Sequence, residues 1–121
     1  MILFINSAEF ERLTFAVIFP GIVKKKTVEI SHPETEKTLE HLDKFLRVNK
    51  VKISNLSKII IVYGPGSFTG IRVGMALAMA FSLAAGMPLY AIKKQQLPKN
   101  LGELPAMRLK KVSADFNPAS A

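Results

Sequence analysis

A cluster of glycine, serine and threonine residues lies between two apolar segments, and its spacing could serve phosphate binding. The cluster comprises Gly64, Gly66, Ser67, Thr69 and Gly70. Backbone amides at a helix start attract anions, so a glycine turn that leads into a helix can hold a phosphate. The spacing Gly-x-Gly-x-x-x-Gly matches neither the Walker pattern nor the dinucleotide fingerprint. A structural turn is therefore favoured, and a phosphate site is the alternative.

The two histidines, His32 and His41, are the other groups that could support chemistry. They are nine residues apart and fall on different faces of a helix, so they cannot share one metal ion. A helix cap and a surface residue are their expected roles. Cysteine is absent, which excludes disulfides and thiolate metal sites. We therefore predict no catalytic residue and no metal ligand.

The glycine turn is positioned by a predicted strand over 59–63 and a predicted helix over 70–85. The strand is apolar and β-branched, as strands covered on both faces are. Ser67 or Thr69 can cap the helix, and Gly86 can end it in the left-handed conformation.

The other elements complete the order β-β-β-α-β-α-β. Further strands are predicted at 2–6, 14–19, 22–30 and 89–92. Short turns join the first three strands into an antiparallel meander, and two right-handed crossovers make the later strands parallel. We predict an α/β fold, the ribonuclease-H-like half of actin-like ATPases. Its mixed five-stranded sheet has the order 3-2-1-4-5 and flanking helices.

The first helix is expected to begin at Ser31 or His32, with Pro33 in its first position. Its end is expected at Asn49 and Lys50. Its predicted apolar stripe consists of Leu39, Leu42, Phe45 and Leu46, with Val48 near the end.

The second helix carries small residues at every fourth position, namely Gly70, Gly74, Ala78 and Ser82. These residues stack on one face and would let another backbone approach closely. The helix is apolar nearly all round, and one small domain rarely covers such a helix completely. The pattern leaves two interpretations open: packing on the chain's own sheet, or contact with a partner protein.

The length of 121 residues fits one domain, and the formal net charge is +8. We predict a single ribonuclease-H-like domain over 1–95 and a basic, partly irregular C-terminal extension over 96–121. A short helix over 95–103 and a strand over 107–113 are the elements considered in this part of the chain. The charge favours contact with nucleic acid or another polyanion, although a solvated basic surface is the more common outcome. The uncharged run 73–92 is interrupted by Gly86 and Pro88, so no membrane span is expected.

The motif Gly64-Pro65-Gly66-Ser67-Phe68-Thr69-Gly70-Ile71-Arg72-Val73-Gly74 resembles the TsaB (YeaZ) family, non-catalytic bacterial partners in making threonylcarbamoyladenosine on tRNA. Ser31-His32, Leu56-Ser57-Lys58-Ile59 and Gly86-Met87-Pro88-Leu89 are also similar to family segments. The resemblance covers about residues 1–95. The family's second actin-like half has no counterpart here, so a minimal form is expected.

One departure from the family concerns the end of the first strand. Family members usually have Ile-Asp-Thr-Ser there, and this chain has Ile5-Asn6-Ser7-Ala8. A neutral asparagine is a poor lone ligand for magnesium, which weakens a catalytic interpretation.

The resemblance implies a non-catalytic subunit that dimerises through its two helices with a catalytic TsaD-type subunit. That subunit would modify tRNA next to the anticodon with its own ATP and metal, and this chain would bind no cofactor. The interface residues implied here are Gly70, Arg72, Gly74, Met75, Ala78, Met79, Ser82 and Leu42.

Further expectations from the resemblance concern partners and location. They are a homodimer when the partner is absent, a TsaE-type ATPase as a further candidate partner, and a cytoplasmic location without membrane contact. Contact with tRNA would be indirect or through the basic tail. The alternative function is an actin-like enzyme that binds a nucleotide or phosphate ester at the glycine loop.

Overall fold

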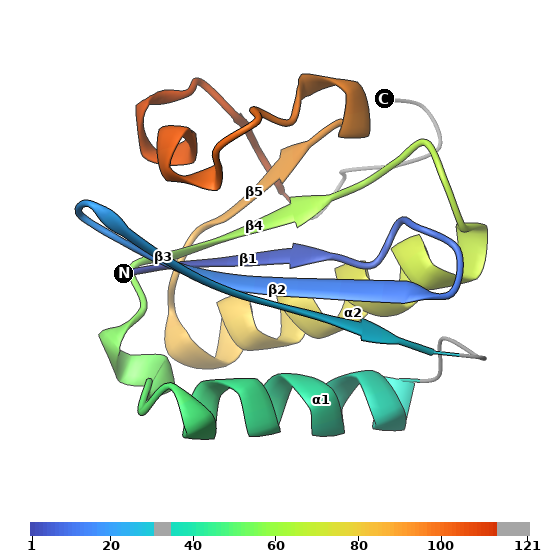
Figure 1. The fold of residues 1–121 in the computed structure, drawn as a ribbon, viewed down its shortest axis with the longest axis horizontal. Coiled ribbons are helices and arrows are strands. Elements are labelled where there is room, and N and C mark those ends of the chain that lie inside the picture. Colours follow the sequence, from blue (N-terminus) through green and yellow to red (C-terminus); the bar gives the residue numbers. More distant parts are fainter. Residues whose placement is uncertain (31–34, 114–121) are drawn as a thin grey trace.

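The computed structural model describes residues 1–30 and 35–113 (Figure 1). The strands are β1 (Ile2–Asn6), β2 (Arg12–Phe19), β3 (Ile22–Glu29), β4 (Lys58–Val62), β5 (Leu89–Ile92) and β6 (Lys110–Lys111). The helices are α1 (Thr35–Val48) and α2 (Phe68–Ala85), and the short 3₁₀ turns are η1 (Ile53–Asn55), η2 (Lys94–Gln96) and η3 (Leu101–Ala106). The predicted α1 start at Ser31 to Pro33 lies outside the described residues.

All six strands join one mixed sheet in the order β3-β2-β1-β4-β5-β6. β1, β2 and β3 pair antiparallel, and β1, β4 and β5 pair parallel. The predicted order 3-2-1-4-5 is therefore confirmed, but the predicted count of five strands is wrong. The sixth strand, β6, pairs antiparallel with β5 and places Lys110 opposite Ala91.

The sheet is covered on both faces, which explains why its central strand β1 is buried at every residue. Alternate β1 residues face opposite sides, so Leu3 and Ile5 belong to one core cluster and Ile2 and Phe4 to the other. Both α1 and α2 cover the first face, where they lie side by side (Figure 1).

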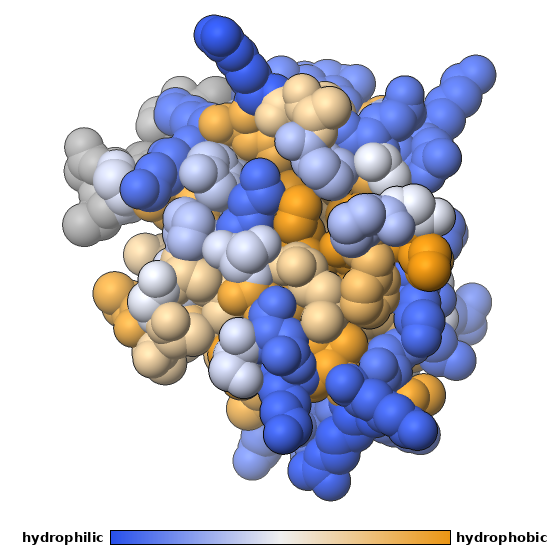
Figure 2. Space-filling view, turned by 90° about the vertical axis from the view of Figure 1, so that its left-hand side faces the viewer, coloured by the Kyte–Doolittle hydropathy of each residue, from blue (hydrophilic) through white to orange (hydrophobic). Residues whose placement is uncertain are grey.

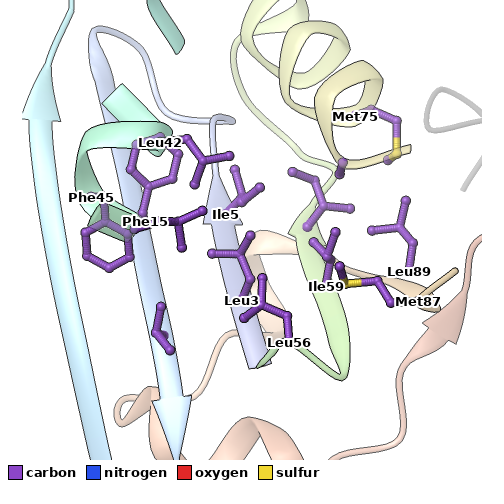
Figure 3. Packing of buried hydrophobic residues seen from close by; sticks show 14 of the residues in the cluster. Leu3, Ile5, Phe15, Leu42, Phe45, Leu56, Ile59, Met75, Met87 and Leu89 are labelled. Carbon is purple, nitrogen blue, oxygen red and sulfur yellow. The ribbon is translucent and has the colours of Figure 1, made fainter. Parts of the chain in front are cut away.

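The first core cluster joins the two helices to the sheet (Figure 3). Leu42 and Phe45 of α1 point at the sheet, and the Phe45 ring lies 5.9 Å from that of Phe15. Met75 reaches the same cluster from α2. Two members of the predicted α1 stripe do not take part, because Leu39 and Val48 are exposed.

The second face is covered by the segment that follows β5. Leu104 of η3 is fully buried in a cluster with Ile18, Ile60 and Ile92. Residues beyond 95, which we predicted to form a partly irregular extension, thus supply β6 and this core contact.

The ends of α2 follow from its capping residues. Ser67 is the N-cap and its Oγ accepts a hydrogen bond from the Gly70 amide at 3.1 Å, so the helix begins at Phe68 and not at the predicted Gly70. Gly86 ends α2 in the left-handed conformation, with φ of 66°, as predicted.

Within the described part of the chain, α2 is the one helix whose length and composition would allow a membrane span. A core helix of a folded domain passes the same test. Six α2 residues, including Gly74 and Ala78, are buried by the chain itself, as in a core helix.

Leu104→Ala should lower the free energy of unfolding by about 2–5 kcal/mol, because it empties a fully buried site. Leu83→Ala is the matched control, since Leu83 is 83% exposed, and it should change stability by less than about 0.5 kcal/mol. Urea unfolding measures both. Equal, small effects would mean that the segment after β5 contributes nothing to the core.

Candidate functional site

The loop after β1 packs tightly against the glycine turn before α2. Asn6 Oδ1 accepts a hydrogen bond from the Ala8 amide at 3.0 Å, and the Ala8 carbonyl accepts one from the Ser67 amide at 2.6 Å. A Cβ on Gly66 would lie 1.9 Å from that same carbonyl oxygen. A side chain at position 66 is therefore excluded by the neighbouring backbone.

The contact continues along α2, where two more glycines meet the same loop. A Cβ on Gly70 would lie 2.1 Å from the Ser7 carbonyl oxygen, and one on Gly74 would lie 1.9 Å from Ser7 Oγ. Ala78 is fully buried further along the helix. Gly70, Gly74 and Ala78 of the small-residue stripe thus pack within the chain, which favours the first of the two interpretations, and the partner interface stays a prediction.

Most of the predicted anion-binding set is engaged within the chain. The Gly64 carbonyl accepts a hydrogen bond from the Lys94 amide at 2.7 Å, and Ser67 uses its amide and its hydroxyl internally. The Gly64–Pro65 peptide is cis, and Thr69 is exposed. The Ser67 and Gly70 amides are thus bonded within the chain, and the phosphate site stays a prediction.

The groups that could hold a metal are dispersed. His41 is half-buried in α1, and His32 lies outside the described residues. In residues 1–30 and 35–113, no three His, Asp or Glu side chains gather closely enough to bind a metal ion. Asn6 is buried and its oxygen is held by the Ala8 amide.

The other predicted interface residues fall into three groups by burial. Leu42 and Met75 are buried in the first core cluster, whereas Met79 and Ser82 are half-buried. Arg72 is exposed in the first turns of α2, where a cation opposes the helix dipole.

The exposed side of α2 carries a second small-residue stripe that the sequence analysis missed. Ala76, Ala80 and Ala84 are exposed and recur every four residues, with Leu83 beside them. The spacing was present in the sequence, but a helix that is apolar on every face does not reveal which stripe points inward.

Exposed apolar side chains mark both helices. Phe68 is 72% exposed at the start of α2, and Leu39 and Val48 of α1 are 40% and 70% exposed. From the side where both helices end, apolar surface lies among charged side chains (Figure 2). We call the exposed stripe of Ala76, Ala80, Leu83 and Ala84, together with Arg72, the outer face of α2.

Comparison with known proteins places this architecture among related folds. Residues 18–97 match the family model described as "TsaD: tRNA N6-adenosine threonylcarbamoyltransferase". The chain is 30% identical over 77 residues to the tRNA threonylcarbamoyladenosine biosynthesis protein TsaB of Buchnera aphidicola, covering 60% of this chain and 37% of that protein. It is 32% identical over 84 residues to an uncharacterized Mycoplasma pneumoniae protein, the MG208 homolog, covering 67% and 43%.

Two solved structures share the fold. YeaZ from Pseudomonas aeruginosa has a TM-score of 0.69 at 22% identity over 76% of this chain and 43% of its own. Thermus thermophilus RuvC, solved with a Holliday junction substrate, has a TM-score of 0.58 at 10% identity, covering 92% and 98%. The predicted ribonuclease-H-like fold is thereby confirmed. The chain spans less than half the length of YeaZ and of the curated relatives named above.

Gly70→Ala should destabilise the protein more than Gly74→Ala. The new Cβ meets a backbone carbonyl at position 70, whereas at position 74 it meets a hydroxyl that can rotate. Overpacking costs about 1–3 kcal/mol and opposes the gain of about 1 kcal/mol that alanine brings to a helix. Equilibrium unfolding measures both variants.

Ser7→Ala provides the control for this pair. Ser7 Oγ is buried and has no hydrogen-bond partner among the described residues, so its removal should cost little. Ser7→Ala should rescue Gly74→Ala in part and leave Gly70→Ala unchanged. A stabilising Gly70→Ala would contradict the tight contact with the loop after β1.

Proposed function

Because this chain belongs to the TsaB (YeaZ) family, within the tRNA N6-adenosine threonylcarbamoyltransferase family that matches residues 18–97, we propose that it is a non-catalytic subunit in the synthesis of threonylcarbamoyladenosine on tRNA. It pairs with a TsaD-type catalytic subunit, and the transfer chemistry, with its ATP and metal, belongs to that subunit. The observation that carries the proposal is the exposed apolar surface of the outer face of α2.

Small exposed residues on the outer face of α2 suit the approach of another helix. Ala76, Ala80 and Ala84 project little beyond the backbone, so a partner helix can pack at short distance. Burial of Leu83 against such a partner would contribute about 1.5–3 kcal/mol. In the absence of the catalytic subunit the same surface would bind a second copy of this chain.

Arg72 supplies a polar contact on the outer face of α2. In the described chain no carboxylate forms an ion pair with Arg72, and the helix dipole disfavours a cation at this position. A carboxylate on the partner would relieve that cost and fix the register of the two helices. The proposed interface retains Arg72, which also belonged to the predicted set. The buried members of that set are replaced by exposed neighbours on α2.

A non-catalytic role is supported by the residue at the end of β1 and by its hydrogen bond to the loop that follows. The position where the family usually carries an aspartate is Asn6, which is buried and holds the Ala8 amide. An enzyme that binds nucleotide at the glycine loop has less support, because the Ser67 and Gly70 amides already donate hydrogen bonds within the chain. We propose a cytoplasmic location and contact with tRNA within the complex.

Leu83→Glu and Ala80→Glu should each weaken binding to the TsaD-type subunit of the same organism by at least about tenfold, since each places a charge in an apolar contact. Calorimetry gives the affinity, and light scattering after size exclusion gives the stoichiometry. Threonylcarbamoyladenosine formation by the assembled proteins should fall in parallel.

Ile22→Glu is the matched control for these two variants. Ile22 is an exposed apolar residue in β3, so the chemical change is the same and the location is different. Its affinity for the catalytic subunit should stay within about twofold of the unaltered chain. Full binding by Leu83→Glu, or equal loss in Ile22→Glu, would refute the assigned surface.

A further inference from the structure

A concave pocket of about 350 Å³ lies beside the end of β5. Its polar lining comes from Tyr63, Lys93, Gln96, Arg108 and Lys110. Three of these side chains are cationic, and no carboxylate of the described residues lines the pocket. The volume falls in the range of about 300–1,000 Å³ that is typical of small-molecule sites.

The register of the sheet explains why these side chains meet. The β4–β5 ladder pairs Val62 with Ile92, and one further step sets Tyr63 beside Lys93. The β5–β6 ladder pairs Ala91 with Lys110, and Lys93 and Arg108, which follow and precede this pair by two residues, line the same pocket. Residues two apart in a strand share a face, so the three cations gather around Ala91.

This arrangement carries an electrostatic cost. Like charges that line one pocket repel each other. No described carboxylate forms an ion pair with Lys93 or Arg108, whereas the neighbouring Lys94 lies 3.6 Å from a Glu9 carboxylate oxygen. An anion bound between Lys93 and Arg108 would remove the repulsion.

The place in the fold also suits a ligand. The pocket adjoins the carboxyl ends of the parallel strands β4 and β5, the edge at which open α/β sheets bind small molecules. The backbone there is held by hydrogen bonds from the Tyr63 amide to the Ile92 carbonyl and from the Lys94 amide to the Gly64 carbonyl. Burial raises the pKa of the Tyr63 phenol, so its hydroxyl stays protonated at neutral pH.

We propose that this pocket binds the phosphate groups of a small phosphorylated molecule, of the class of pyrophosphate or a nucleoside polyphosphate. The Arg108 guanidinium can hold two phosphate oxygens at once, and Lys93 adds a point charge. A concave site favours a compact anion over an RNA backbone, which follows extended basic surfaces. The proposal is independent of the role of α2 in partner binding.

The test uses calorimetry on the 121-residue chain with sodium pyrophosphate and with ATP, each at low and at physiological salt. Binding should saturate at one site, and the double variant Lys93→Gln/Arg108→Gln should raise the dissociation constant at least about tenfold. Backbone amide shifts in NMR should localise to residues 91–96 and 107–110, which gives a readout that does not depend on the variant's folding.

Lys24→Gln/Lys26→Gln, with the same loss of charge on the exposed strand β3, is the control and should change affinity by less than about twofold. If both double variants weakened phosphate binding equally, the effect would come from the net charge of the protein and not from the pocket. That result would overturn the proposal. It would also be overturned if neither phosphate compound bound while tRNA did, or if Asn6→Ala alone abolished binding, since the site would then lie at the glycine loop.

Discussion

The close approach of the loop after β1 to the first turns of α2 is the constraint on which the rest of the structure depends. Three glycines, Gly66, Gly70 and Gly74, meet the backbone or side chains of Ser7 and Ala8 at distances that admit no Cβ. This contact sets how α2 lies on the sheet, and it engages the Ser67 amide of the glycine turn. The glycines of this motif thus allow close packing within the chain.

The direction of α2 follows from that contact and determines which surface remains for function. Because one small-residue stripe packs against Ser7, in the loop after β1, and against Ile61, the opposite stripe of alanines faces outward. Such a helix has two faces suited to close packing, and the domain fills one of them. Packing within the chain does not account for the small residues of the exposed face, which includes Arg72 and Leu83.

The sequence predicted the features that rest on strong local signals. Gly86, the Ser67 cap and the apolar run of β4 defined α2 and its strand, and crossover handedness then defined the order of five strands. The inward stripe was not predictable, because apolar residues surround α2 and leave no polar side to orient it. The strand considered over 107–113 contains β6, but the cover of the second face by η3 was not predictable, since η3 is too short to show a period.

The excess positive charge comes from several groups of lysine and arginine residues, and these groups have different structural roles. Lysines on the two outermost strands, Lys24 to Lys26 on β3 and Lys111 on β6, protect exposed edges from pairing with other chains. Lys58 lies over the Tyr90 ring at 5.2 Å. Lys93 and Arg108 have neither role, and both line the pocket beside the end of β5. A net charge that suggests nucleic acid at first sight is therefore better resolved into edge protection and one concentrated anion site.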